Sequence, residues 1–136
     1  MKKNNETYLK TDFAEVYYDG ALLRVFFKPE KKICVELIKD HFRQVMELTG
    51  RKRVAVYFDT GSVSLINIPF EFIRYVAENE YNPYFSACAV VQHSYTMRKL
   101  VEMFNAVFTP TLLTEVFDNE EKAMAWLKPH IPVLEQ

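Results

Sequence analysis

The chain has 136 residues, of which 49% are hydrophobic and 15% aromatic, and its net charge at pH 7 is −1. These values suit a single domain over residues 1–136 and exclude global disorder. Lys and Arg are scattered, so no basic stripe indicates a nucleic-acid partner. No apolar run approaches the roughly 20 residues that a membrane span needs.

The first ten residues carry two lysines and no apolar segment, so we expect no secretory signal peptide. We therefore expect a cytoplasmic protein, with residues 1–6 flexible. Cys34 and Cys88 stand in no C-x-x-C spacing, and we expect both to stay reduced.

The first third of the chain predicts a β-hairpin followed by a helix. Residues 11–29 form the hairpin around Asp19-Gly20, because glycine accepts the positive φ of a tight turn. Residues 30–50 predict an amphipathic helix that ends at Gly50. Its apolar stripe consists of Cys34, Leu37, Ile38, Phe42, Val45 and Leu48.

The rest of the chain alternates buried strands with helices. Residues 53–59 and 87–91 are predicted strands, and residues 54–58 and 87–91 are nearly continuous apolar runs, as in strands that are covered on both faces. One helix begins at Pro69 and a second near Met97. The side chains expected to point inward are Phe70, Ile73, Val76 and Ala77 in the first helix, and Met97, Leu100, Val101, Phe104 and Val107 in the second.

A last strand is predicted at residues 112–117, followed by a helix with Trp126 against the sheet edge. We expect Asp118 to cap this helix, with Glu121 completing a capping box. Because alternating strands and helices need crossover connections, the order predicts an α/β fold. In this fold an N-terminal β-hairpin precedes β-α repeats that form a mostly parallel, five-stranded sheet.

The motifs of common enzymes are missing from the sequence. Only three glycines are present, which excludes both the dinucleotide-binding and the P-loop glycine motifs. The three histidines have no second ligand nearby, so we expect no metal site. We expect no cofactor and no enzymatic activity.

Ligands of open α/β sheets bind beyond the carboxyl ends of the strands. Residues 59–67 and 92–96 should meet there at one rim. The binding candidates on these segments are Asp59, Thr60, Ser62, Ser64, Asn67, His93, Ser94 and Tyr95.

Several interpretations of these polar residues stay open. They can shape turns and cap helices, and Thr60, Ser62 or Ser64 can accept a phosphate. Asp59 and His93 can also act as an acid–base pair. The cluster of Tyr75, Tyr81, Tyr84 and Tyr95 can line a pocket or pack at the rim.

Three stretches resemble the STAS domain, the sulfate-transporter and anti-sigma-factor-antagonist domain. They are VAVYFDTGSV, ACAVVQHSYTMRKLVEMF and TEVFDNEEKAMAWL, and together they are similar to SpoIIAA-like proteins, some described as STAS/SEC14-like. The resemblance implies a non-enzymatic module that binds a partner protein or a small ligand. Antagonists of that family carry a phosphorylatable D-S-S-G motif, where this chain has Leu65-Ile66-Asn67-Ile68-Pro69.

We therefore expect a bacterial, STAS-like regulatory or protein-interaction module that can form a homodimer. The alternative is a protein that binds or carries a small, lipid-like apolar ligand, with aromatic side chains lining the space between helices and sheet. Eleven Phe and eight Tyr residues are compatible with both expectations.

Overall fold

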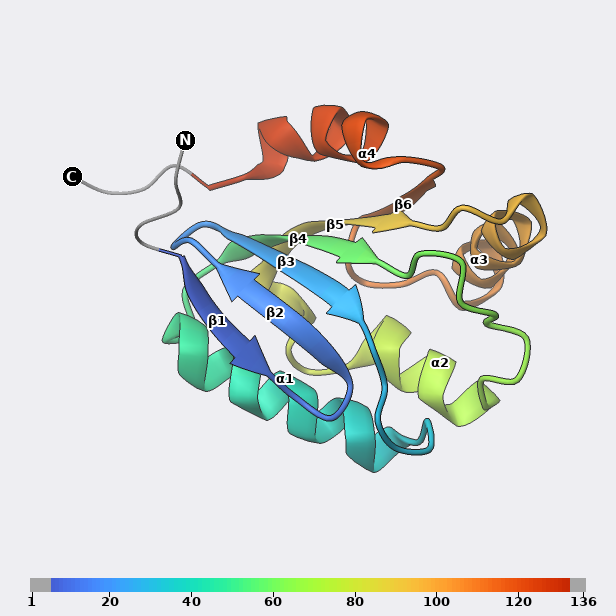
Figure 1. The fold of residues 1–136 in the computed structure, drawn as a ribbon, viewed down its shortest axis with the longest axis horizontal. Helices are drawn as coiled ribbons and strands as arrows, with labels where there is room; N and C mark the ends of the chain where they lie inside the picture. Colours follow the sequence, from blue (N-terminus) through green and yellow to red (C-terminus); the bar gives the residue numbers. More distant parts are fainter. Residues whose placement is uncertain (1–5, 133–136) are drawn as a thin grey trace.

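The computed structural model describes residues 6–132, which form a six-stranded sheet in the order β1-β2-β3-β4-β5-β6 (Figure 1). The strands are β1 Thr7–Lys10, β2 Ala14–Tyr18, β3 Leu22–Phe27, β4 Val54–Asp59, β5 Phe85–Val91 and β6 Thr114–Phe117. The first three strands pair antiparallel, whereas β3 to β6 pair parallel. The α/β class is confirmed, and the sheet is mixed.

The prediction of five strands was wrong because β1 precedes the hairpin. Three of its four residues are exposed, so this edge strand lacks the buried face that an alternating pattern would indicate. With β1 added, antiparallel pairs make up a larger part of the sheet than the sequence predicted. Of the segment expected to be flexible, residues 1–5 lie outside the described residues, and Glu6 binds Arg24 at 2.8 Å.

Within residues 6–132, four α-helices and two short 3₁₀ helices complete the fold. They are α1 Val35–Thr49, α2 Phe70–Glu78, η1 Asn82–Tyr84, α3 Tyr95–Phe108, α4 Glu120–Leu127 and η2 Lys128–His130. Helix α4 lies on one face of the sheet, and α1 and α2 lie on the other, while α3 lies at the right of Figure 1. These layers follow from parallel strands whose crossover helices lie on one face.

The two faces of the central strands contribute to two separate hydrophobic clusters. Ala55, Ala87 and Ala89 face α4, where Ala123 and Leu127 are fully buried against them. On the opposite face, β4 and β5 present larger side chains, namely Val56, Phe58, Phe85, Cys88 and Val90. A register irregularity between β4 and β5 accompanies this arrangement. Tyr57 and Val91 belong to the same cluster as these alanines, which leave room for α4 to pack against β4 and β5.

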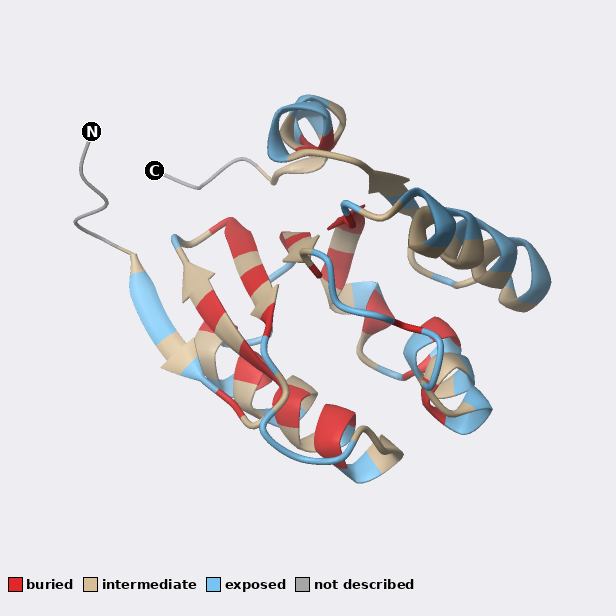
Figure 2. Cartoon of the chain, turned by 45° about the vertical axis from the view of Figure 1, so that its right-hand side comes forward, coloured by how far each residue is buried: buried red, intermediate tan, exposed pale blue. Residues whose placement is uncertain are grey.

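Helix α3 packs less closely than its sequence predicted. None of its residues is buried, and Val107, expected to point inward, is 67% exposed (Figure 2). Val101 and Phe104 occupy the inner side as predicted, and Phe108 lies there as well. The helical periodicity identified the apolar side of α3 but carried no information on its distance from the sheet.

The helix ends show which local signals the fold uses. Gly50 ends α1 with φ 65°, as predicted. Asn119, and not Asp118, caps α4 by accepting a hydrogen bond from the Lys122 amide at 2.9 Å. Phe70 was expected inside but is 71% exposed, because it begins α2 at the end of the covered face and Phe72 is buried instead.

Candidate functional site

The two segments predicted to meet at one rim do lie side by side. The Thr60 amide donates to the Val91 carbonyl, and the His93 amide donates to the Gly61 carbonyl, each at 2.8 Å. The buried side chain of Gln92 joins the segments a second time, donating to Thr60 Oγ1 at 2.9 Å and to the Val63 carbonyl at 3.1 Å. The parallel crossovers therefore bring the predicted candidates to one edge of the sheet.

Asp59 and Thr60 serve the structure of this rim. The Asp59 carboxylate accepts hydrogen bonds from Tyr57 Oη at 2.9 Å and the Gly61 amide at 2.8 Å. Burial, together with the bond to Asp59, raises the pKa of Tyr57, so its hydroxyl remains a donor. Thr60 is buried and donates to the Val91 carbonyl at 2.7 Å.

The remaining predicted residues lie at the surface or cap helix α3. Ser94 caps α3 by accepting from the Met97 amide at 3.3 Å, and it is one of the two caps, Ser94 or Thr96, that the sequence allows. His93 is exposed, and its Nδ1 lies 3.0 Å from the Asp118 carbonyl, so it does not bond Asp59. Tyr95 is 66% exposed, and Ser62, Ser64 and Asn67 are exposed as well. That these residues contact a partner stays a prediction.

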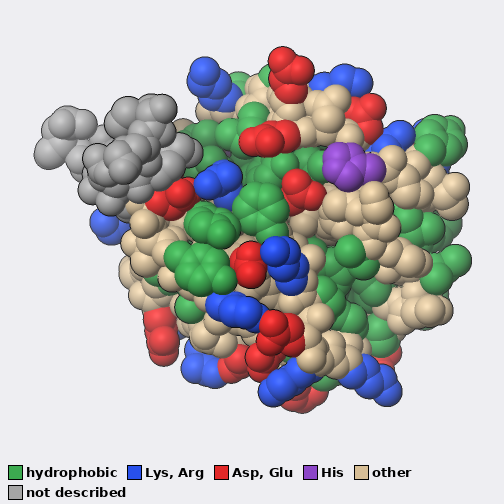
Figure 3. Space-filling model, viewed as in Figure 1, with side chains coloured by type: hydrophobic (Ala, Val, Ile, Leu, Met, Phe, Trp, Pro, Cys, Tyr) green, Lys and Arg blue, Asp and Glu red, His purple; other side chains and the backbone are tan. Residues whose placement is uncertain are grey.

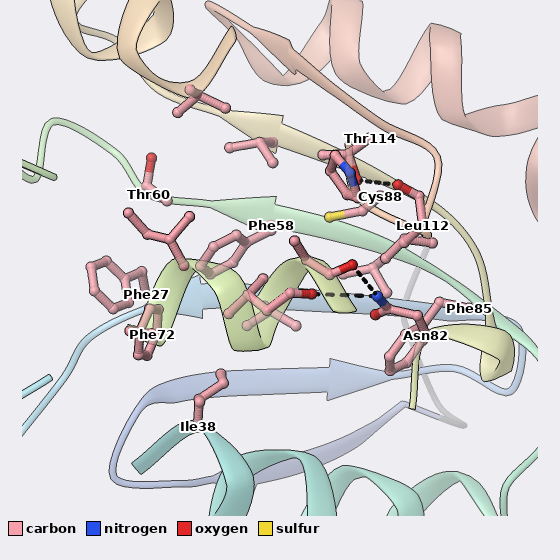
Figure 4. A pocket seen from close by; sticks show the side chains of 18 of the residues that line it. Phe27, Ile38, Phe58, Thr60, Phe72, Asn82, Phe85, Cys88, Leu112 and Thr114 are labelled. Atoms are coloured by element: carbon pink, nitrogen blue, oxygen red, sulfur yellow. Dashed lines mark hydrogen bonds between the residues drawn. The ribbon is translucent and has the colours of Figure 1, made fainter. Parts of the chain in front are cut away.

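A separate feature lies beneath this rim, between the sheet and helices α1, α2 and α3. It is an apolar cavity of about 230 Å³ (Figure 4). The strands contribute Val56, Phe58, Phe85, Cys88 and Val90, and the helices contribute Ile38, Phe42, Phe72, Val101, Phe104 and Phe108. The cavity exists because α3, which has no buried residue, stays apart from the sheet face that it covers.

Most polar side chains on the cavity wall already have hydrogen-bonding partners. Asn82 donates to the Ala77 carbonyl at 3.1 Å (Figure 4). It also donates to Thr111 Oγ1 at 2.8 Å, and together these bonds fix the end of α2. Thr114 donates to the Leu112 carbonyl at 2.8 Å. Burial raises the pKa of Cys88 to about 12, so its thiol stays protonated and unreactive.

His41 is the titratable residue on this wall that the sequence analysis did not select. It is 4% exposed, and burial lowers the pKa of its imidazole to about 4. Its Nδ1 lies 2.8 Å from Thr11 Oγ1. The sequence did contain a signal for His41, because it lies on the same side of the predicted helix as Ile38, Phe42 and Val45. A polar residue within such an apolar stripe is unusual.

The described part of the chain offers neither a metal site nor a membrane-spanning helix. Within residues 6–132, no three His, Cys, Asp or Glu side chains lie close enough together to hold a metal ion. In the same range, no helix combines the length and the apolar content that crossing a membrane requires. Cys34 and Cys88 are both free thiols.

Comparison with known proteins gives one match. A family described as "Domain of unknown function (DUF7793)" matches residues 16–131, which include the last three residues of β2, the strands β3 to β6 and all four α-helices. No curated protein and no solved structure matches the chain. The match covers most of the 136 residues, so the chain belongs to the DUF7793 family.

Proposed function

We propose that this protein binds a small apolar molecule in the cavity between the sheet and helices α1 to α3. The observation that carries this proposal is a cavity of about 230 Å³ lined mainly by aliphatic and aromatic side chains. An apolar cavity of roughly 150 Å³ is already enough to take up benzene in another protein. Removing hydrocarbon surface from water drives such binding.

The loose packing of α3 favours a binding role over a purely structural one. An unfilled cavity lacks the van der Waals contacts that its walls would otherwise make, which costs stability. A ligand that fills it restores those contacts between α3 and strands β4 and β5. We expect binding without chemical conversion, because the Cys88 thiol on the wall is held in its protonated form.

Native mass spectrometry of freshly purified protein tests the proposal. We expect a species heavier than the polypeptide, whose extra mass is released into an organic extract. Protein that carries only the polypeptide mass, and that takes up no added apolar probe such as 1-aminoanthracene, would contradict the proposal.

Two substitutions in α3 localise the binding. Val101 lies on the cavity wall, so Val101→Trp should fill the cavity and abolish binding of 1-aminoanthracene. Val107 is 67% exposed on the same helix, so Val107→Trp makes the same change outside the cavity and should leave binding unchanged. Equal loss in both variants would place the ligand elsewhere.

A second candidate function is the STAS-like, protein-interacting role that the sequence predicts, in the cytoplasm of a bacterium. Exposed apolar side chains on the segment from β4 to α2 favour it, since Val63, Ile66 and Phe70 are 40%, 67% and 71% exposed. Hydrophobic side chains also reach the surface at the right of Figure 3, where α3 and this segment lie in Figure 1. Such exposure is typical of interaction surfaces.

Light scattering during size-exclusion chromatography tests self-association through this surface. We expect a dimer that Phe70→Ser converts to a monomer. If the wild type stays monomeric across the micromolar range, it does not act as a homodimer, and this part of the second proposal is contradicted.

A further inference from the structure

The His41 side chain is a buried polar group at the cavity whose hydrogen bonding the fold leaves incomplete. It projects from α1, is 4% exposed, and lies between the rings of Phe13 and Phe42, whose centroids are 4.9 and 5.8 Å away. Since burial lowers its pKa to about 4, the imidazole is neutral near pH 7. A neutral imidazole has one N–H donor and one acceptor nitrogen.

The hydroxyl of Thr11 determines which ring nitrogen carries the proton. Thr11 Oγ1 accepts hydrogen bonds from the amides of Phe13 at 3.2 Å and Ala14 at 3.1 Å, which occupy both of its lone pairs. Its single hydrogen is therefore free to donate to His41 Nδ1, at the shorter distance of 2.8 Å, in preference to the Ala14 carbonyl at 3.2 Å. Nδ1 is then the acceptor, and Nε2 carries the proton.

This tautomer leaves the Nε2–H donor without a partner within the protein. Among residues 6–132, the only hydrogen bond to the His41 ring is the one at Nδ1. Buried donors in folded proteins are almost always satisfied by protein, water or ligand, because an unmade bond inside an apolar environment is costly. The ring lines the cavity, so an acceptor for Nε2–H can come from a molecule that occupies it.

The rest of the wall restricts the chemistry of that acceptor. None of the described residues that line the cavity is Lys, Arg, Asp or Glu. A charged group on the ligand would lose its hydration without gaining an opposite charge, which strongly disfavours binding. A neutral oxygen on a mainly hydrocarbon skeleton loses far less hydration free energy when it enters the cavity.

We propose that the cavity selects an uncharged hydrocarbon molecule that carries a carbonyl oxygen, and that His41 Nε2–H donates a hydrogen bond to this oxygen. This inference rests on the proposed function and adds the polar feature of its ligand. Thr11 acts as a positioning residue, since its hydroxyl fixes the tautomer and the ring orientation.

Two probes of nearly equal shape test the inference, 2-octanone and 2-methyl-1-octene, in which a methylene group replaces the carbonyl oxygen. Affinities are measured for the wild type, for His41→Phe, which keeps an aromatic ring, and for the control His130→Phe. His130 packs against Trp126 of α4 with a centroid distance of 5.1 Å, away from the cavity. We expect His41→Phe to lower the affinity for the ketone, relative to the affinity for the alkene, by roughly two- to tenfold. His130→Phe should leave this ratio of affinities unchanged.

Histidine ¹⁵N spectra of the wild type give a second measurement that does not depend on any variant folding. We expect a protonated Nε2 on His41, whose resonance moves on addition of 2-octanone and stays in place with 2-methyl-1-octene. Binding of both probes with an unchanged ratio in His41→Phe, or a proton on Nδ1, would overturn the role of His41 and leave the proposed function intact. Failure of both probes to bind would overturn both proposals.

Discussion

Burial of the His41 imidazole couples the stability of the fold to pH. In the folded chain the pKa of this group is about 4, against an ordinary value near 6.5, because burial disfavours the charged form. Between these two values the unfolded chain binds a proton that the folded chain does not. The free energy of unfolding therefore rises with pH across this range. The stability that His41 contributes is fully present above the unfolded pKa and is lost as the pH falls toward 4.

We expect this group to remove about 3 kcal/mol of stability between pH 7 and pH 4. Urea unfolding of the wild type and of His41→Phe at several pH values measures this loss of stability. All other titratable groups are present in both proteins, so the difference between the two comes from His41. The wild type should lose about 3 kcal/mol more than the variant over this interval. Identical pH dependences would contradict a buried, neutral His41.

Thr109 ends α3 in a left-handed conformation, with φ 39° and ψ 70°. A β-branched residue is strained there, whereas glycine adopts this region freely. Thr109→Gly should therefore raise the free energy of unfolding by about 1 kcal/mol in urea titrations.

Gly50 provides the opposite test. It has φ 65°, and nothing lies within 4 Å of an added Cβ, so Gly50→Ala should cost about 1 kcal/mol through backbone strain alone. A destabilising effect of Thr109→Gly, together with the expected effect of Gly50→Ala, would contradict the left-handed conformation of Thr109.

Single residues also show what the sequence could and could not predict. Gly50 was identified correctly because its role depends on local backbone geometry alone, and for the same reason the cap of α3 was narrowed to Ser94 or Thr96, of which Ser94 is the cap. His41 was not selected, because its importance comes from Thr11, which is 30 positions away in the sequence. Phe70 was misplaced because periodicity gives the side of a helix and not the point at which the covered face ends.

At the level of elements, Gln92 holds the loops after β4 and β5 together. It is fully buried, donates to Thr60 and Val63, and accepts from the Ser94 amide at 3.1 Å. Gln92→Leu leaves the Val63 carbonyl and the Ser94 amide without this partner.

We expect Gln92→Leu to lower the free energy of unfolding by about 2–3 kcal/mol. Hydrogen exchange should accelerate most at residues 60–64 and 93–95, since the two loops lose their shared side chain. The control Gln44→Leu removes a half-buried glutamine of α1 that donates only to Asp40 at 2.8 Å, and it should lower the free energy of unfolding by about 0.5 kcal/mol or less. Uniform acceleration across all strands would show that Gln92 stabilises only the fold as a whole.

The predicted elements were most accurate where apolar runs were long. Strand β4 was predicted to within one residue of its observed bounds, because a strand buried on both faces leaves an uninterrupted apolar signal. Strand β1 left no such signal, since it is short and exposed at the sheet edge. The meeting of the two loops followed from parallel topology, but the cavity did not, because it depends on how far α3 stands from the sheet.

At the scale of the whole molecule, a ligand in the cavity should stabilise the fold. A ligand that binds only the folded state at 100 times its Kd adds about 2.7 kcal/mol. For a domain of this size, we expect 2-octanone to raise Tm by about 10 °C at that saturation. Val101→Trp should show no such shift, and an equal rise in this variant would place the stabilising site outside the cavity.

Nuclear Overhauser effects between a bound molecule and the protein test most directly whether the cavity is the binding site. With methyl-labelled protein saturated with 2-octanone, the account predicts contacts from the ligand to Val90, Val101 and Leu112, which line the cavity from β5, from α3 and from the segment before β6. Contacts confined to exposed groups such as Val63 and Val107, with none to these three residues, would contradict it.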